Sequence, residues 1–446
     1  MEVTSLGVFV ILFYFILVVT IGYLASKKKS EDSFLIANRN LGSVHLAATL
    51  NAGFIGGGFL VIFIGIAYTY GIPALWLIFG QSLGLVLFAI FGKSIKETSD
   101  KNRFYTLADY FNNKFDKKTG VLIGLMLFLF FMGFIIIQFV AGGKILSGLI
   151  GLSYQLSVLV IGLIIMIYLY LGGFRAVVRT DLLQYLMLFF FMGVIGFFVL
   201  SSNISPADAS FSSIEIPTII AFIIFGMFFV IIGGDVWQRA YAAKSLKVMR
   251  KGFSLAALLT IIFGLLAVFI GIAAKINFPS IDPAQALVKG FSFLLPPELL
   301  WIGIIILFAA IMSTSDTLIF LASMNLSNDI FSRFKNISKK SLVKLTRSSI
   351  FFVTITGVTL ALLIPDIVNF AFIFTAAMIT LAPIIIIMQF KEIKSNSVFY
   401  ALLITPIVVL AIAILTPIRE ELSLVSLVVA STILFASEKI KIKAAY

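Results

Sequence analysis

Four oxygen-bearing side chains follow one another inside a long apolar run in the second half of the chain. The segment reads AAIMSTSD and ends with Ser313 to Asp316. A carboxylate in hydrocarbon is costly, so an ionisable residue within an apolar span is a candidate for function. Hydroxyl and carboxylate oxygens are ligands of hard cations, and residues three or four apart share one face of a helix. Two overlapping faces follow, formed by Ala310, Ser313 and Thr314 and by Ser313, Asp316 and Thr317.

Glycines gather in the second apolar run, which reads LNAGFIGGGFLVIF and contains Gly53 and Gly56 to Gly58. Glycine permits unwinding, and a bilayer tolerates unwound backbone only where it faces protein or a cavity. We therefore expect a broken helix here, with close helix packing at glycine as the alternative. Gly226, Gly233 and Gly234 mark the seventh run in the same way. Interrupted helices at matching places in two inverted halves are typical of a central binding site.

The elements that position these residues are predicted to be membrane helices. The chain of 446 residues is 61% hydrophobic and only 12% charged, whereas soluble domains average about 25% charged residues. Its apolar blocks are long enough to cross a bilayer as helices. We predict an all-α polytopic membrane protein with about thirteen spans. These cover roughly residues 4–26, 43–70, 73–97, 119–148, 154–172, 180–201, 215–238, 251–275, 298–325, 346–364, 366–390, 397–416 and 421–437.

The net charge of +13 reflects membrane topology and gives no indication of a nucleic-acid partner. With the N-terminus outside, 29 of the 33 lysines and arginines fall in inner loops or the tail. The exceptions are Lys144, Lys275, Lys289 and Arg419. By the positive-inside rule we expect the N-terminus outside and the C-terminus inside.

Several classes of chemistry are excluded by composition. The chain has no cysteine and a single histidine, His45, which we place at the membrane interface. Thiol chemistry, a cysteine-rich metal site and a histidine-based triad are therefore absent, and we do not expect an enzyme. No Walker-type glycine loop is present, so any energy would come from an ion gradient, and the alternatives are a passive pore or a sensor. The outer connections at about 202–214 and 276–297 are expected to be lids or short helices.

Four ordered stretches resemble the sodium/solute symporter family, which includes bacterial Na⁺/proline, Na⁺/sugar and Na⁺/sialic acid symporters. LGGFRAVVRTDLLQ is similar to a family signature of a glycine pair, Ala-Val, Thr-Asp and Gln, and STSDTLIFLASMNLSNDI to its hydroxyl-rich helix. DVWQRAYAAKSLKVMRKG and YTLADYFNNKF are similar to two inner segments. These stretches cover Leu171–Gln184, Ser313–Ile330, Asp235–Gly252 and Tyr105–Phe115. The resemblance extends from Phe34 to the last span.

The resemblance implies a leucine-transporter-type inverted-repeat core and a sodium site. The core would be residues 43–390, with repeats 43–201 and 215–390, preceded by 1–42 and followed by two helices in 391–446. The implied Na⁺ ligands are the carbonyls of Ala52, Ile55 and Ala310 and the hydroxyls of Ser313 and Thr314. The alternative is that both hydroxyls bond to carbonyls of their own helix.

A second cation site is implied one turn further inward, where Asp181 joins Ser313, Asp316 and Thr317. Asp316 adds a full negative charge, which would favour a second Na⁺ or carry a proton on the release path. The alternative is a structural hydrogen bond or an ion pair with Arg175 or Arg239. Where some relatives carry an aspartate shortly after the position of Ala52, this chain has Phe54, so no carboxylate is expected beside the solute at this place.

The solute pocket is predicted beside the sodium, against the broken helix. Mid-span amides need partners in a membrane, so Gln81 and Gln138 rank above the aromatic residues. No mid-span lysine or arginine faces the pocket, so a side-chain clamp on a carboxylate is not expected, although helix-end N–H groups could hold one. The candidate residues are Asn51, Phe54, Gly56, Phe59, Gln81, Gln138, Phe225, Phe228 and Phe374.

The sequence thus predicts an inner-membrane secondary transporter that couples Na⁺ to uptake of a small organic solute. An amino acid such as proline is favoured, with a sugar second and nucleobases ranked near sugars. A proton-coupled transporter using Asp316 or Asp181 is the nearest alternative, followed by a membrane sensor on the same fold. The expected partners are the solute, Na⁺ and the lipid bilayer, and the oligomeric state stays open.

Overall fold

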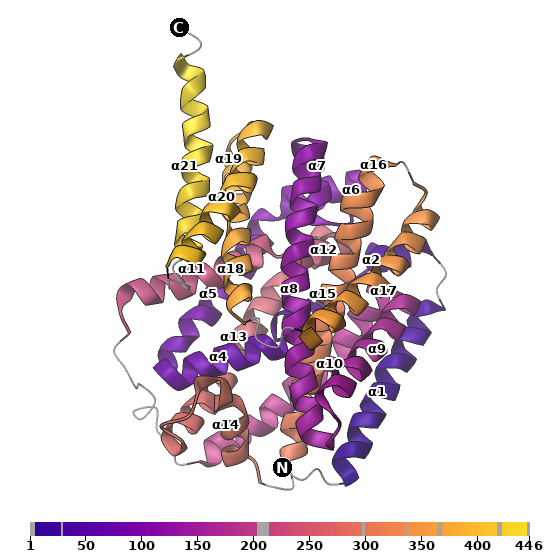
Figure 1. Cartoon of the computed structure of the whole chain (residues 1–446), viewed down its shortest axis with the longest axis vertical. Coiled ribbons are helices and arrows are strands. Elements are labelled where there is room, and N and C mark those ends of the chain that lie inside the picture. Colours follow the sequence, from indigo (N-terminus) through magenta and orange to yellow (C-terminus); the bar gives the residue numbers. More distant parts are fainter. Residues whose placement is uncertain are drawn as a thin grey trace. The chain divides into compact units, whose positions relative to one another are not determined.

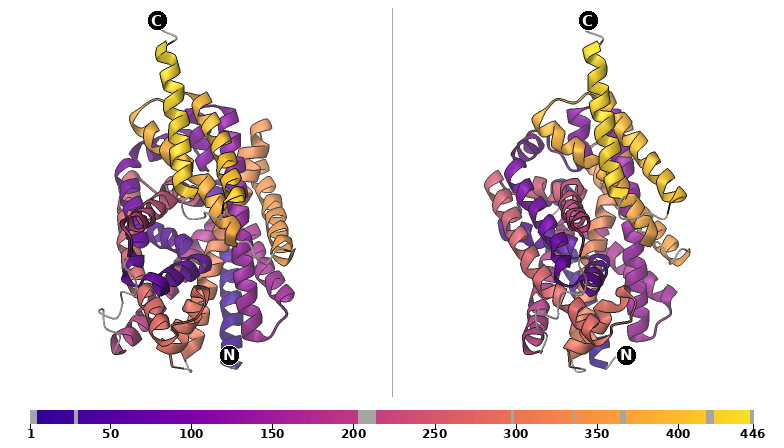
Figure 2. Two further views of the ribbon diagram at one scale, coloured as in Figure 1. Left: turned by 60° about the vertical axis from the view of Figure 1, so that its left-hand side comes forward. Right: turned by 90° about the vertical axis from the view of Figure 1, so that its left-hand side faces the viewer.

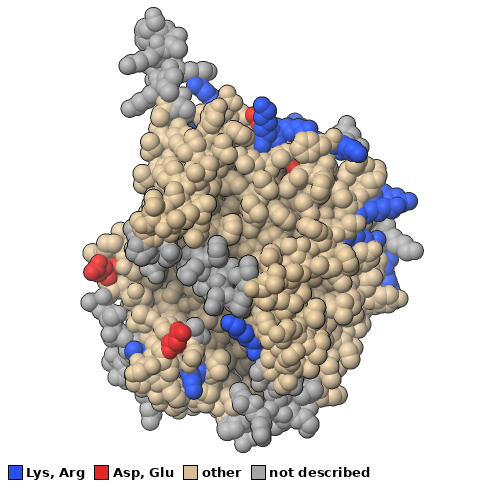
Figure 3. All heavy atoms as spheres, in the orientation of Figure 1, with Lys and Arg blue, Asp and Glu red and all other residues tan. Residues whose placement is uncertain are grey.

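The computed structural model describes residues 5–27, 30–202, 214–296, 299–335, 337–363, 368–416 and 422–443. Within these ranges the secondary structure is helical, and the one β-contact is an isolated bridge between Leu41 and Ala243. Charged side chains are sparse on the face shown in Figure 3, where uncharged residues cover most of the surface. The predicted all-helical class is confirmed.

Nine helices in the described part of the chain are long and apolar enough to cross a membrane. Two further spans are added if each of two bent helix pairs counts as one. Shorter apolar helices at Ile11–Ser26 and Leu422–Ala436 coincide with the first and last predicted spans. The total of thirteen stays a prediction, because parts of the connections at 202–214 and 416–422 lie outside the described residues.

The chain forms two compact units. Figure 1 labels the helices that make them up. Unit 1 comprises Met1–Gly92, Gln138–Met227 and Ala242–Thr317. Its complete helices are α1 (Ser5–Ser26), α2 (Glu31–Ile36), η1 (Ala37–Arg39), α3 (Ser43–Phe54), α4 (Gly57–Tyr70), η2 (Ile72–Ala74), α5 (Leu75–Phe91), α9 (Tyr154–Gly172), α10 (Phe174–Ser201), α13 (Leu246–Asn277), η4 (Pro283–Gln285) and α14 (Ala286–Leu294).

Unit 2 comprises Lys93–Ile137, Phe228–Tyr241 and Leu318–Tyr446. Its helices are α6 (Lys93–Asn102), α7 (Leu107–Lys114), most of α12 (Gly234–Ala242), the π-helix η6 (Asn325–Phe331), α16 (Ser332–Phe334), α17 (Lys339–Leu363), α18 (Val368–Ile379), α19 (Leu381–Phe390), α20 (Ser395–Leu415) and α21 (Leu422–Lys443). Besides α12, whose last residue Ala242 belongs to unit 1, three helices continue from one unit into the other, namely α8 (Lys117–Ile150), α11 (Ile216–Ile232) and α15 (Leu300–Met324).

The two predicted helix breaks are present. The second predicted span is divided between α3 and α4, whose axes meet at 68°. The seventh is divided between α11 and α12, which meet at 51° beside Gly233. Gly56 precedes the first turn of α4, and Gly57 and Gly58 are its first two residues. This agrees with the prediction, because glycine lowers the cost of leaving the helix.

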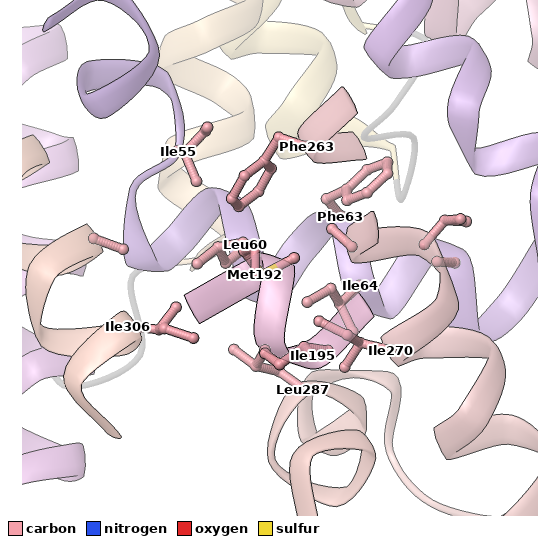
Figure 4. Packing of buried hydrophobic residues seen from close by; sticks show 14 of the residues in the cluster. Ile55, Leu60, Phe63, Ile64, Met192, Ile195, Phe263, Ile270, Leu287 and Ile306 are labelled. Atoms are coloured by element: carbon pink, nitrogen blue, oxygen red, sulfur yellow. The ribbon is translucent and has the colours of Figure 1, made fainter. Parts of the chain in front are cut away.

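Unit 1 is held together by an apolar core under the first broken helix. Ile55, Phe63, Phe263 and Ile306 belong to this core and come from the break, α4, α13 and α15 (Figure 4). The predicted short helix in the 276–297 connection is α14, which packs against α4 and α13 (Figure 2). Burial of apolar side chains supplies about 25 cal/mol per Å², so this core fixes the position of α4 and α15 around the break.

Unit 2 contains a buried polar network where α7 meets η6. Thr106 and Asp109 form a capping box at the start of α7, and the Thr106 hydroxyl also donates to Asp329 over 2.7 Å. Asn328 donates to both Asp109 and Asp329, and Arg333 forms ion pairs with both carboxylates. The YTLADYFNNKF stretch therefore anchors η6, the helical segment that follows α15 in the chain.

Candidate functional site

The break between α3 and α4 leaves backbone carbonyls without helical partners. Helix α3 ends at Phe54, and the Ile55 N–H closes its last turn by donating to the Asn51 carbonyl over 2.8 Å. The carbonyls of the last turn have no N–H four residues further on, because α4 starts in a new direction. Ala52 and Ile55 are buried at this place, so the freed oxygens point into protein.

The hydroxyl-lined face of α15 lies against these carbonyls. The Ser313 Oγ is 3.0 Å from the Ala52 carbonyl oxygen and 3.0 Å from the Ala310 carbonyl oxygen. The Thr314 Oγ1 is 3.4 Å from the Gly53 carbonyl oxygen. A serine hydroxyl has one proton, so Ser313 can donate to only one of its two neighbours at a time. The result is a cluster of oxygens with fewer protons than acceptors, which suits a cation.

The three hydroxyl residues of the STSD segment therefore differ in whether they bond to their own helix or reach α3. Ser315 donates to the Ile311 carbonyl of its own helix over 2.6 Å, which is the kind of bond that the alternative interpretation gave to Ser313 and Thr314. Thr314 instead reaches across to α3, and Ser313 reaches both its own helix and α3. Helical spacing accounts for this difference, since Ser315 is on another face of the helix.

Gly56 brings the two helices close at the break. A β-carbon on Gly56 would overlap the Thr314 Oγ1 and lie 2.8 Å from the Thr314 Cβ. Any side chain at residue 56 must therefore displace Thr314 from the carbonyls of α3.

Replacing Gly56 with alanine is expected to lower cation-driven transport at least about tenfold, because a shift of about 1 Å in a positioned group has large effects. Gly193→Ala is the matched control, since a β-carbon at Gly193 meets nothing within 4 Å. Initial uptake rates of the two variants, at equal protein in the membrane, provide the measurement. Equal rates would show that the close approach at Gly56 has no part in transport.

Two buried carboxylates lie in unit 1 beside the hydroxyl face. Asp316 accepts from the Tyr168 hydroxyl over 2.8 Å, and its Oδ2 is 3.1 Å from the Thr180 hydroxyl. Asp181 accepts from the Thr49 hydroxyl. Both aspartates have no solvent exposure, and the Oδ1 of Asp316 has no hydrogen-bond partner among the described residues. Buried charges require pairing or extensive hydrogen bonding, and the hydroxyl groups of Tyr168 and Thr180 that donate to Asp316 are neutral.

Arg175, one of the two arginines considered as an ion-pair partner for the aspartates, donates to the Ser33 hydroxyl over 3.0 Å. Arg239 lies in unit 2 and pairs with Asp235 at 3.4 Å. Thr317 is buried, as the second face of the segment requires.

Sequence reasoning missed three of the donors to the carboxylates. Thr49 precedes Ala52 by three residues, so helical spacing was a usable signal. Thr180 lies within the quoted Thr-Asp signature, but its link to Asp316 was not predicted. Tyr168 carries no local signal, because one tyrosine in an apolar helix is ordinary.

Among the predicted solute residues, Asn51 is already committed to packing. Its Nδ2 donates to the Ala47 and Ala256 carbonyls, and its Oδ1 accepts from Thr260 over 2.6 Å. These bonds tie α3 to α13 and use both ends of the amide. Asn51 therefore stabilises the packing of α3 against α13 in this conformation.

Gln81 and Gln138 are the two candidates with unused polar atoms. Both are buried, and the Gln81 Nε2 and the Gln138 Oε1 have no hydrogen-bond partner among the described residues. Phe59 is half-buried and stacks on Phe63 with ring centroids 5.9 Å apart. The remaining candidates in unit 1 are the buried Phe54 and the half-buried Phe225, whereas Phe228 and Phe374 belong to unit 2.

A broken helix facing a hydroxyl-lined helix within a set of apolar spans is typical of secondary membrane transporters. Solved structures share this fold. A Na⁺-coupled sialic acid symporter in a substrate-bound outward-open state is similar over 98% of both chains, with a TM-score of 0.86 at 18% identity. Mhp1, a nucleobase-cation-symport-1 family transporter, is similar over 94% of this chain and 92% of its own, with a TM-score of 0.55 at 13% identity.

Sequence comparison identifies the family. The model of the sodium:solute symporter family matches residues 34–404. A sodium/proline symporter of Staphylococcus aureus (strain Newman) is 24% identical over 378 residues, which cover 78% of this chain and 73% of that protein. The chain therefore belongs to the sodium:solute symporter family, a family of multi-pass membrane transporters whose coupling ion is Na⁺.

Proposed function

We propose that this chain takes up a small organic solute by alternating access, driven by inward movement of Na⁺. The observation that carries the proposal is the approach of the Ser313 hydroxyl to the Ala52 carbonyl across the helix break. Na⁺ would be held by the carbonyls of Ala52, Ile55 and Ala310 and by the hydroxyls of Ser313 and Thr314. Binding would join α3 to α15 and so favour the conformation that accepts solute.

A second cation is proposed at Asp181, Asp316 and Thr317. Asp316 has hydroxyl partners, and a positive ion would offset the charge of the two carboxylates. Two occupants fit this chemistry, a second Na⁺ or a proton carried on Asp316 during release. The proton would make the transporter partly or wholly proton-coupled, which is the second candidate mechanism.

The proposed solute is an amino acid such as proline, with a sugar second. The unused amide atoms of Gln81 and Gln138 support a neutral or zwitterionic solute that needs hydrogen bonds. The relatives named as sodium/proline symporters support an amino acid, and the sialic acid symporter supports a sugar-like acid. We place the N-terminus on the outer side and the C-terminus on the inner side of the cell membrane. The proposed inverted repeats are residues 43–201 and 215–390.

Uptake into proteoliposomes is the test. The purified chain is expected to accumulate one solute from a panel of amino acids, sugars and nucleobases when Na⁺ is high outside, and not when Na⁺ is equal on both sides. Collapse of the sodium gradient with an ionophore provides the control. Uptake of every solute at the same rate with and without the gradient would contradict the proposal, and uptake driven by a proton gradient without Na⁺ would select the second mechanism.

A further inference from the structure

The first helix, α1, buries one polar side chain, Tyr14, among those of its side chains that the structure describes. Phe9, Phe13 and Ile16 are more than half exposed, whereas Tyr14 is 4% exposed on the opposite face. A tyrosine hydroxyl is costly to bury unless it finds a partner. Its location therefore indicates that α1 contacts something polar inside unit 1.

The partner of Tyr14 is Gln184 on α10. The Gln184 Nε2 donates to the Tyr14 hydroxyl over 2.7 Å, and the Gln184 Oε1 is buried without a partner among the described residues. Gln184 follows Asp181 by three residues, so the two side chains share a helix face.

Helix α1 also packs against the other two helices that carry the carboxylate cluster. A β-carbon on Gly22 would overlap the Tyr168 Cβ and lie 3.0 Å from the Tyr168 Cα, so α1 sits directly on the backbone of α9. Phe15 meets Phe308 of α15 edge to face, with ring centroids 5.9 Å apart. The helix that precedes the predicted repeat core thus contacts every helix that supplies Tyr168, Asp181 and Asp316.

The alternative acceptor for the Gln184 amide explains why Tyr14 matters. A buried amide N–H without an acceptor turns to the strongest one in reach. The acceptor that we expect is the Asp181 carboxylate, because glutamine and aspartate three or four residues apart on a helix form hydrogen bonds. An amide bound there would compete with a cation for the same oxygen.

We propose that Tyr14 is a positioning residue that holds the Gln184 amide away from the carboxylate pair, leaving Asp181 and Asp316 available to the coupling cation. The inference rests on the proposed cation site at these two residues. It assigns to α1, which lies outside the predicted inverted repeats, a role in setting cation affinity.

The test compares the ion dependence of uptake in three variants. Tyr14→Phe is expected to raise the half-saturating concentration of the driving cation about tenfold, because the freed amide competes with the cation for the same carboxylate oxygen. The KM for the solute, measured at saturating cation, should stay unchanged. Tyr23→Phe on the same helix is the matched control, since its ring is exposed, and it should behave as wild type.

The second arm separates positioning from a loss of packing. Adding Gln184→Met to Tyr14→Phe removes the competing amide and is expected to return the half-saturating concentration toward the wild-type value. The double variant leaves neither partner unpaired, so it remains measurable if Tyr14→Phe gives little folded protein. A double variant with the same or weaker cation affinity than Tyr14→Phe would overturn the proposal, as would a Tyr14→Phe variant equal to Tyr23→Phe.

These outcomes are distinguishable from a failure of the proposed function. If wild-type uptake ignores both sodium and proton gradients, the function itself is wrong. If wild-type uptake follows a gradient and Tyr14→Phe has no effect on ion dependence, only the role of Tyr14 is wrong.

Discussion

Replacing Thr314 or Ser313 with alanine is expected to raise the half-saturating Na⁺ concentration for uptake by about 10- to 100-fold. Each variant loses one hydroxyl oxygen from a buried cluster, where a hydrogen bond or ligand to a charged species is worth about 1.5–3 kcal/mol. The Ser313 Oγ is 3.0 Å from two carbonyl oxygens, and Thr314 faces the end of α3. The measurement is initial uptake rate against Na⁺ concentration, with the solute at a fixed excess.

Two control variants make this result specific. Thr314→Ser keeps the hydroxyl and should retain sodium dependence close to wild type. Ser315→Ala removes a buried hydroxyl from the same turn of α15, but this hydroxyl bonds to the Ile311 carbonyl of its own helix. Ser315→Ala should therefore leave the half-saturating Na⁺ concentration for uptake unchanged. A larger effect at Ser315 than at Ser313 and Thr314 would contradict the placement of the ion between α3 and α15.

Neutralising Asp316 is expected to have the second large effect. Asp316→Asn keeps the shape and an acceptor for Tyr168 and Thr180, and it removes the negative charge from a site with no solvent exposure. We expect uptake to fall about tenfold or more and its dependence on cation concentration to become less steep. The physical reason is that one buried carboxylate attracts a second cation less strongly than two.

The cation that binds at this site is identified by the ion dependence of uptake that Asp316→Asn loses. If a second Na⁺ binds, Asp316→Asn lowers the Hill coefficient for Na⁺ toward one. If a proton binds, the variant loses the response to a pH gradient and keeps the Hill coefficient. Glu97→Gln, with an exposed side chain on α6, is the control for loss of one negative charge. A variant that matches wild type in both respects would show that Asp316 has a structural role.

The local elements of the site were predictable from the sequence. Glycine lowers the cost of leaving a helix wherever it occurs, so the run around Gly56 predicted the break between α3 and α4. The spacing of Ser313 and Thr314 places them on one helix face whatever surrounds the helix. Hydrophobic block lengths likewise predicted the helical membrane class, because a bilayer fixes the length of a span.

Tertiary structure alone decided which groups meet across the fold. Thr49 and Asp181 are 132 residues apart, and Tyr168 and Asp316 are 148 apart. Hydroxyls such as Tyr168 look alike in sequence whether they face lipid, backbone or a carboxylate, since periodicity constrains a side chain only within its own helix. The same limit applies to Asn51, a predicted solute residue whose amide is used to join α3 to α13. The sequence by itself determined the broken helix, the hydroxyl face and the membrane class, while the packing of α1, α9 and α10 around α15 decided what surrounds the carboxylates.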